Sequence, residues 1–260
     1  TASPTEDDTG MSTRYCRGGR AATLGGGVTI LAGATLGGGT TINWMNCVLP
    51  PAHVRDDWAR EHGIDGIDGA EFDADLSCVL NRIGATDECS AYNGPNQRLA
   101  HGASRLGWSF RRAVRNVDPA RYSEESGGFV GYGDRSGAKQ GAVNTFLADA
   151  SQSGARILTS CHAERIMMRA GRAAGVMVTQ RGAKGARTVH VDAATVVVAG
   201  GALETPALLL RSEIGGAHAG RHLHLHPVAA LAAIYAGPQN PWVGAPQTVV
   251  VDEFADVEHG

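Results

Sequence analysis

The sequence has little net charge and no long hydrophobic run. Its 23 basic and 26 acidic side chains leave a formal charge of −3 at pH 7, which gives no basic surface for nucleic acid or an anionic membrane. No stretch of about 18 apolar residues occurs, so we expect no integral membrane segment. We therefore expect no nucleic-acid partner, which leaves small molecules as the expected binding partners.

Cysteines and aromatic residues are also few. The five cysteines, Cys16, Cys47, Cys78, Cys89 and Cys161, are far apart and form no C-x-x-C pair, which argues against a disulfide framework and a zinc ribbon. A reducing compartment suits such a chain best, and we predict a cytoplasmic location. Glycine, in contrast, is abundant, with 36 residues, and indicates many tight turns and close backbone approaches.

Hydrophobic spacing predicts a mixture of helices and strands. Residues 1–24 have the composition of a polar lead-in. The elements expected after it are a strand at 28–33, helices at 55–63, 73–84 and 142–154, and a loop at 123–141. Val143 and Phe146 are expected to point inward from the last of these helices.

The clearest pattern lies between residues 155 and 212. Four short alternating stretches predict a β-meander, and they cover 155–161, 164–170, 173–180 and 186–193. The apolar run "ATVVVAGG" then predicts a strand buried on both faces of a sheet, followed by a helix at 202–212. A buried strand, a double glycine and a helix are the arrangement that meets a nucleotide at the edge of a sheet. The predicted fold class is α/β, with mixed α+β character.

For two further motifs we favour an interpretation without a bound ligand. "GYGDRSG" at 131–137 resembles a dinucleotide loop in its glycines, but only "FV" precedes it, so we interpret it as a mobile surface loop. "RHLHLHP" places His222, His224 and His226 in alternation, a spacing that can bind a metal ion from one face of a strand. No acidic or cysteine ligand lies nearby in the sequence, and we expect packed or hydrogen-bonded histidines and no metal.

Two glycine motifs carry more weight, "LGGGTTIN" at 36–43 and "AGGALETPALLLRS" at 199–212. Each pairs glycines with a following turn or helix, so that main-chain N–H groups can approach a flat ring or a phosphate. Two tight turns without any ligand are the alternative, and the spacing alone does not decide between them.

Taken together and in order, these segments resemble the glucose–methanol–choline (GMC) family of flavin oxidoreductases, in particular its long-chain (fatty) alcohol oxidases and dehydrogenases. "LGGGTTINWMN" is similar to the first family signature, "GGALETPALLLRSEIG" to the second, and "GRHLHLHP" to the segment that follows. The resemblance implies an FAD flavoprotein with a Rossmann-like sheet. It also implies oxidation of the CH–OH group of an alcohol by hydride transfer to flavin N5, with oxygen or another compound as electron acceptor.

The resemblance also implies cofactor-binding residues. Flavin contacts come from the first signature, the adenosine contact from a strand residue, and the diphosphate or ribose contact from the double glycine. In this sequence they are Gly37, Gly38, Gly39, Thr40, Asn43, Trp44 and Asn46, then Ala163, then Gly200 and Gly201. Some relatives attach FAD to a histidine just before the asparagine. Ile42 stands at that position, which implies non-covalent FAD.

The family pattern extends past both ends of the sequence. An N-terminal G-x-G-x-x-G unit is not found, and the catalytic histidine of the family is expected beyond residue 260, so no catalytic residue is assigned. His224 and His226 match structural positions. We expect a central fragment with an incomplete FAD-binding domain at 1–50 and 142–220 and a partial substrate domain at 51–141 and 221–260.

Two alternatives stay open at this point. One is a non-catalytic or degenerate protein of the same ancestry. The other is an unrelated, metal-binding β-rich protein that uses His222, His224 and His226.

Overall fold

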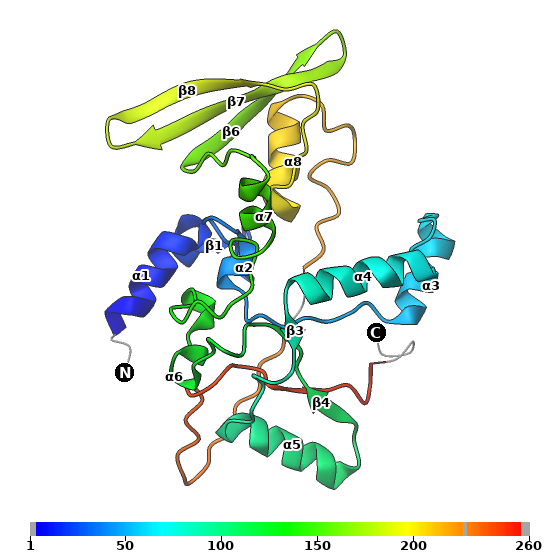
Figure 1. Cartoon of the computed structure of the whole chain (residues 1–260), viewed down its shortest axis with the longest axis vertical. Helices are drawn as coiled ribbons and strands as arrows, with labels where there is room; N and C mark the ends of the chain where they lie inside the picture. The colour runs from blue at the N-terminus through cyan, green and yellow to red at the C-terminus, as the bar shows by residue number, and fades with distance from the viewer. Residues whose placement is uncertain (1–3, 226–227, 256–260) are drawn as a thin grey trace. The chain divides into compact units, whose positions relative to one another are not determined.

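A computed structural model describes residues 4–225 and 228–255. The chain divides into two compact units, the first formed by residues 1–155 with 234–260 and the second by 156–233. Both helices and antiparallel strands occur, which confirms the predicted mixture (Figure 1). Within the described ranges, no helix combines the length and the apolar character needed to cross a membrane.

The first unit consists of short elements joined by loops. Its helices are α1 (Pro4–Arg14), α2 (Gly39–Ile42), α3 (Ala52–His62), α4 (Ala70–Arg82), α5 (Gly94–Leu106), α6 (Glu124–Gly127) and α7 (Phe146–Gln152), with 3-10 turns η1 (Cys16–Gly19) and η2 (Val130–Tyr132). Its strands form antiparallel pairs, β1 (Ala21–Ala22) with β2 (Thr29–Ile30), β3 (Ala85–Thr86) with β5 (Arg115–Asn116), and β4 (Phe110–Arg112) with β9 (Val249–Val251).

Two helices of this unit end where the sequence predicts. Gly63 follows α3 with a φ of 61°, and Gly84 follows the last turn of α4 with a φ of 59°. Only glycine adopts this left-handed conformation without a steric penalty, so each glycine stops its helix and turns the chain.

A small apolar core holds the first unit together. Met45, Cys89, Val117, Val130 and Ala138 form one buried cluster, against which the half-buried Tyr122 packs. These residues come from loops and short strands, and they bring the segment after α2 into contact with the segment around η2.

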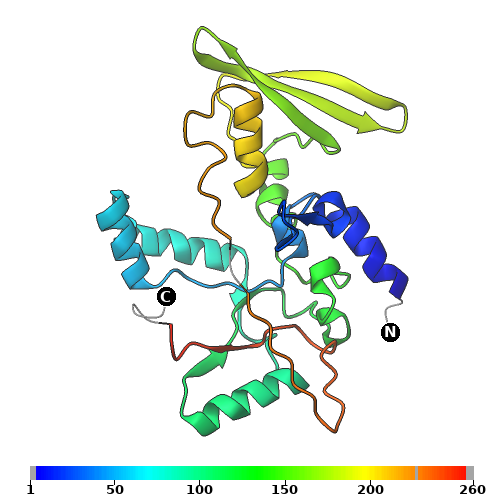
Figure 2. The same ribbon diagram turned by 180° about the vertical axis from the view of Figure 1, so that it is seen from behind.

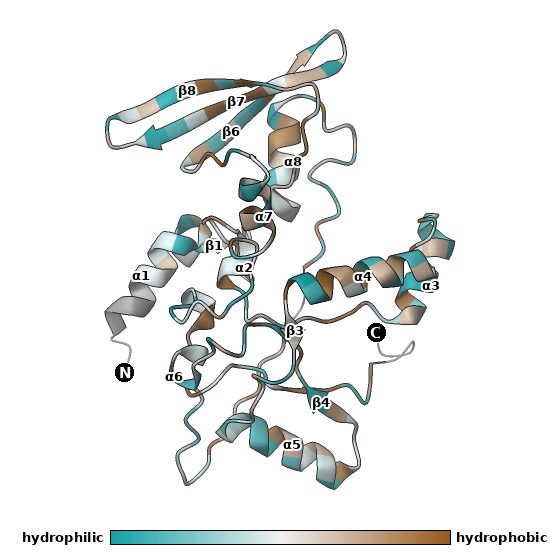
Figure 3. Cartoon of the chain, in the orientation of Figure 1, coloured by the Kyte–Doolittle hydropathy of each residue, from teal (hydrophilic) through white to brown (hydrophobic). Residues whose placement is uncertain are grey.

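The second unit is a three-stranded meander with one helix. Strands β6 (Cys161–Arg169), β7 (Arg172–Gly182) and β8 (Gly185–Asp192) pair antiparallel in sequence order, as predicted. Helix α8 (Gly201–Arg211) packs against β6 (Figures 1 and 2), and hydrophobic residues are concentrated along α8 and β7 (Figure 3). Ser212 Oγ fixes this contact, because it accepts a hydrogen bond of 2.9 Å from the Ile166 N–H.

The buried strand predicted at 194–201 is wrong. Residues 195–199 form no strand, and Val197 is 84% exposed. A strand can be buried on both faces of a sheet only if other strands flank it, and none does so in the described part of the chain. The first predicted meander strand, 155–161, is likewise not a strand until Cys161.

Other predictions in the first unit need smaller corrections. The lead-in contains α1, and the strand expected at 28–33 is reduced to the two residues of β2. Val143 and Phe146, expected to point inward, are 38% and 47% exposed. The loop expected at 123–141 contains α6 and η2. Short-range spacing predicts that a segment can bury one face, but long-range neighbours decide whether it does.

Candidate functional site

The glycine-rich segment of the first unit forms a sharp turn into the one-turn helix α2. Gly37 and Gly38 both have positive φ, 83° and 54°, which other residues adopt only at a cost. The segment lies directly against Gly33, where an added Cβ would be 2.5 Å from the carbonyl carbon and oxygen of Gly38. Position 33 therefore requires glycine, because one backbone stretch packs directly on the other there.

One side of this turn is left open. The hydroxyl of Thr40 donates to Gly37 O over 2.7 Å, and that of Thr41 donates to Leu36 O over 2.7 Å. Both side chains thus bond to their own turn. A Cβ added at Gly38 or Gly39 would meet nothing within 4 Å, so the backbone there is accessible to a ligand.

A buried lysine holds the end of α2. Lys139 is 5% exposed, and its Nζ donates to Thr41 O over 2.8 Å, Asn43 O over 2.7 Å and Val130 O over 2.9 Å. A cation at the C-terminal carbonyls of a helix is electrostatically favourable. Lys139 therefore joins the end of α2 to η2.

The loop before this lysine is organised by one carboxylate. Asp134 accepts from the Ser136 hydroxyl over 2.6 Å and from the Lys139 N–H over 2.6 Å. Residues 131–137 are mostly half-buried, which differs from the expected mobile surface loop. The Asp134 bonds explain the difference, since a side chain that ties its own loop together replaces solvent as the hydrogen-bond partner.

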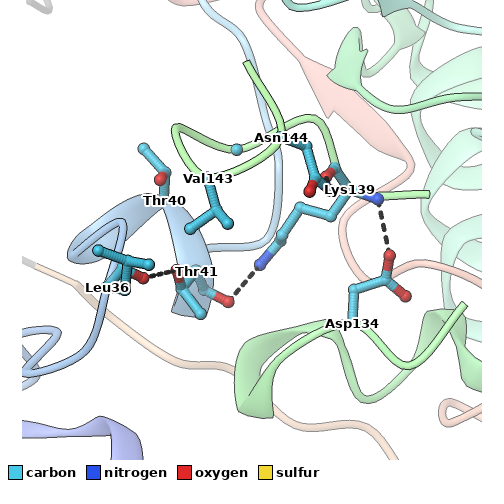
Figure 4. Close-up of a pocket in the computed structure, with 8 residues that line it drawn as sticks. Leu36, Thr40, Thr41, Asp134, Lys139, Val143 and Asn144 are labelled. Carbon is cyan, nitrogen blue, oxygen red and sulfur yellow. Dashed lines mark hydrogen bonds between the residues drawn. The ribbon is translucent and has the colours of Figure 1, made fainter. Parts of the chain in front are cut away.

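An open pocket of about 210 Å³ lies between these segments (Figure 4). It is lined by apolar and polar side chains and by backbone, namely Leu36, Thr40, Thr41, Asp134, Lys139, Gly141, Val143 and Asn144. Pockets for drug-sized ligands typically have volumes of about 300–1,000 Å³. The pocket is thus large enough for part of a large cofactor only.

A second buried cation supports the segment just after α2. Arg115 has no exposed surface, and it donates to Trp44 O over 2.5 Å, to Ser90 Oγ over 3.0 Å and to the carbonyls of Pro246 and Gln247. None of these acceptors is a carboxylate. Burial lowers the pKa of Arg115 from its ordinary value to about 10, so the guanidinium stays charged at neutral pH.

We expect Lys139 to titrate at unusually low pH. Burial lowers its pKa from 10.5 to about 8, and the charge of Asp134 offsets part of this effect. Between about pH 8 and 10.5 the unfolded chain binds more protons than the folded one, so this group makes folding more favourable as pH rises, by roughly 3 kcal/mol in total. The sequence contains only one other lysine, Lys184. In a Lys184→Arg variant labelled with ¹³C-lysine, the single Cε signal should titrate at about pH 8.

A Cε signal that titrates at the ordinary lysine pKa would contradict this placement of Lys139. The contribution to stability is measured as the difference in free energy of unfolding between wild type and Lys139→Met across the same pH range.

The remaining predicted residues of the first signature lie beside these cations. Asn43 Oδ1 accepts from the Met45 N–H over 3.2 Å, and Trp44 is 46% exposed. Asn46 donates to Gln247 Oε1 over 2.8 Å, while its own Oδ1 is buried and has no partner within the described residues. The structure thus brings together every predicted site residue from Gly37 to Asn46.

The three other predicted site residues lie in the second unit. The carbonyl of Ala163, on β6, accepts from Arg211 of α8 over 3.1 Å. Gly200 caps α8, and Gly201 begins it with a φ of 80° and open space where a Cβ would be. Ala163 thus contacts the C-terminal end of α8, whereas Gly200 and Gly201 lie at its N-terminal end, about 15 Å away along the helix.

Lys139, Asp134, Asn144 and Arg115 are not identified as site residues by the sequence patterns. The available signal is weak: Lys139 is one of two lysines and stands in a run of small residues, "SGAKQGA". Its acceptors are main-chain carbonyls, which have no signature in a sequence.

A metal centre built on the alternating histidines finds no support. Across 4–225 and 228–255, no group of three or more His, Cys, Asp or Glu side chains is arranged to hold a metal ion. The ring centroids of His218 and His222 are 6.1 Å apart, and His226 lies outside the described residues.

Comparison with known proteins places this site in a family. The model of the GMC oxidoreductases matches residues 11–228, and the chain belongs to that family. GMC oxidoreductases are flavoproteins that use FAD. The match covers the glycine-rich segment, both buried cations, the meander and α8.

Similar proteins include plant enzymes and a bacterial one. The chain is 34% identical to the long-chain-alcohol oxidase FAO3 of Arabidopsis thaliana over 84% of its length, and 35% identical to FAO4B of the same plant over 82%. It is 33% identical to an uncharacterized GMC-type oxidoreductase of Mycobacterium tuberculosis over 92% of its length. These matches cover 30%, 29% and 38% of the relatives, so the chain spans about a third of their length.

Proposed function

We propose that this chain is the part of an FAD-dependent alcohol oxidoreductase that carries the flavin-facing loop. The observation that supports this best is the open backbone at Gly38 and Gly39. A flat ring can approach such a surface to van der Waals distance, because no Cβ stands in its way. The domain division predicted from the sequence and the Rossmann-like sheet belong to this proposal.

The residues present fit the cofactor. Main-chain groups of Gly38 and Gly39 would lie against the flavin, and Asn43 and Asn46 would offer side-chain amides. The orphaned Oδ1 of Asn46 is an acceptor that a bound ligand could satisfy, which matters because a buried polar atom without a partner costs about 1–3 kcal/mol. Ala163, Gly200 and Gly201 would hold the adenosine and diphosphate portions.

Binding is proposed to be non-covalent. Ile42, which stands where some family members carry the histidine that bonds to FAD, is 7% exposed and has no nucleophilic atom. The thiol nearest to it in sequence, Cys47, has a pKa raised by burial, which keeps the thiol protonated and unreactive.

When bound, FAD supplies the acceptor for a hydride from an alcohol carbon. The glycine-rich segment and its supports would position the ring and exclude water from one side of it. The substrate is proposed to be a long-chain alcohol, because the similar Arabidopsis proteins are named long-chain-alcohol oxidases. Oxygen or another compound would then take the electrons. The cytoplasmic location stays a prediction.

Purified protein is expected to bind FAD and to show the visible absorbance band of a flavin. If the bound FAD is in a working enzyme, adding a long-chain alcohol without oxygen bleaches that band, and a short polar alcohol at the same concentration bleaches it more slowly. Because the catalytic histidine is expected beyond residue 260, the bleaching test is made on a longer protein that contains this chain, and such a protein that binds FAD but is not bleached by any alcohol would favour the non-catalytic alternative. Protein that binds no FAD at saturating concentration would end the proposal.

A further inference from the structure

The three contacts of Lys139 identify its charge state. Thr41 O, Asn43 O and Val130 O all accept from one Nζ, at 2.7 to 2.9 Å. Only an ammonium has three N–H groups, and a neutral amine has two. All three bonds therefore exist together only while Lys139 is protonated, and a neutral side chain at this position leaves at least one carbonyl without its donor.

These bonds link two separate elements through a single atom, Lys139 Nζ. Thr41 and Asn43 lie at the end of α2 and just after it, whereas Val130 begins η2. The contact is tight on the η2 side too, because a Cβ added at Gly131 would be 2.9 Å from Trp44 Nε1. Tyr15 follows directly after α1, and its hydroxyl donates to Gly131 O over 2.5 Å, which also holds η2 in place.

We propose that Lys139 is a positioning residue for the segment Thr41–Trp44, which it holds in the one conformation that presents Asn43 and Trp44 to the cofactor. The relevance to the cofactor rests on the function proposed above, whereas the effect on the segment does not. Arg115 also holds the Trp44 carbonyl, but the two side chains themselves are weakly held: among the described residues the Asn43 side chain bonds to the Met45 N–H alone, and Trp44 is half exposed.

Energetics favour a positioning role over a general contribution to stability. Burying an ammonium is costly, as the lowered pKa of Lys139 indicates, and this cost offsets part of the stability that its hydrogen bonds to the carbonyls contribute. Among the described residues Lys139 Nζ makes no ion pair, and its acceptors there are carbonyls at the end of α2, just after it and at the start of η2. What the charge adds, relative to methionine, is therefore the fixed direction of three carbonyls.

The test uses the 260-residue chain with Lys139→Met, Lys139→Arg and, as a matched control, Lys184→Met in the exposed turn between β7 and β8. Amide hydrogen exchange is measured first without FAD. We expect Lys139→Met to exchange at least about tenfold faster in residues 40–46, because three carbonyls lose their hydrogen-bond donor and the segment opens more readily. The meander should keep its wild-type exchange. Lys139→Arg, which retains charge and donors, should recover most of the protection, and Lys184→Met should match wild type.

FAD affinity is the second readout, from a titration of each variant. We expect Lys139→Met to bind FAD about tenfold more weakly, in line with the loss of loop order, and Lys139→Arg to bind within a few-fold of wild type. If wild type binds no FAD, the proposed function fails, but the exchange measurement still tests the role of Lys139. Wild-type exchange at 40–46 in folded Lys139→Met would overturn that role, and so would equal defects in Lys139→Met and Lys139→Arg.

A variant that fails to fold is also informative. If Lys139→Met is unfolded by circular dichroism, Lys139→Gln replaces it, since its amide keeps two N–H donors. We expect Lys139→Gln to fold. Its amide exchange rate at residues 40–46 should lie between the rate of wild type and the rate of an unprotected loop. Unfolding of both neutral variants would overturn the positioning role in favour of a purely structural one.

Discussion

Replacing Arg115 with methionine is expected to destabilise the first unit strongly. Four acceptors lose their donor at once, the carbonyls of Trp44, Pro246 and Gln247 and the hydroxyl of Ser90. Each orphaned group costs about 1–3 kcal/mol, and removing the buried charge returns only part of this. We expect a net loss of about 3–5 kcal/mol, a large share of the about 5–15 kcal/mol by which domains are stable.

The measurement is urea unfolding followed by tryptophan fluorescence and circular dichroism. Arg112→Met is the matched control, because Arg112 is exposed and its side chain lies over the Tyr92 ring, at 5.7 Å from the centroid. We expect the control to lie within about 0.5 kcal/mol of wild type, as surface changes usually do. A wild-type unfolding midpoint for Arg115→Met would mean that the guanidinium does not hold these segments together.

Replacing Gly33 with alanine is expected to abolish or strongly weaken FAD binding. The new Cβ would stand 2.5 Å from the carbonyl carbon and oxygen of Gly38 and 2.9 Å from the nitrogen of Gly39. Those atoms are backbone, so the clash cannot be relieved by rotating a side chain, and the turn itself must move. We expect the dissociation constant for FAD to rise at least about a hundredfold, since shifting a packed backbone costs several kcal/mol.

The sequence provides its own control for this change. The other triple glycine contains Gly25 and Gly27, where an added Cβ meets nothing within 4 Å and φ is not left-handed. Gly25→Ala and Gly27→Ala should bind FAD as wild type does, while circular dichroism shows that all three variants are folded. FAD affinity unchanged in Gly33→Ala would show that the turn at Gly38 does not contact the cofactor.

Much of the local structure follows from the sequence. Gly63 and Gly84 end their helices as predicted, because a left-handed residue after a helix is a short-range requirement that glycine meets. The meander is predicted for the same reason, since alternation and turns are both encoded within a few residues. The glycine-rich turn at 37–39 is also visible directly, and the resemblance of its flanks to a family signature is borne out by the family match.

The rest depends on contacts between distant residues. The run at 195–199 has the composition of a buried strand, but it has no strand beside it in the described residues and stays exposed. Lys139 and Arg115 are separated by 71 to 132 residues from most of the carbonyls that they hold. Since every residue has a carbonyl, no sequence pattern marks these partners, and the support beneath the predicted loop becomes visible only in the fold.

The most direct measurement of the proposed cofactor contact is amide hydrogen exchange of the wild-type chain with and without saturating FAD. We predict that FAD slows exchange in residues 37–46 and leaves the first triple glycine, at 25–27, unchanged. Slower exchange at 200–201 is expected as well, from the portion that would hold the diphosphate. FAD that binds without any protection of 37–46 would contradict the placement of the flavin against this glycine-rich segment.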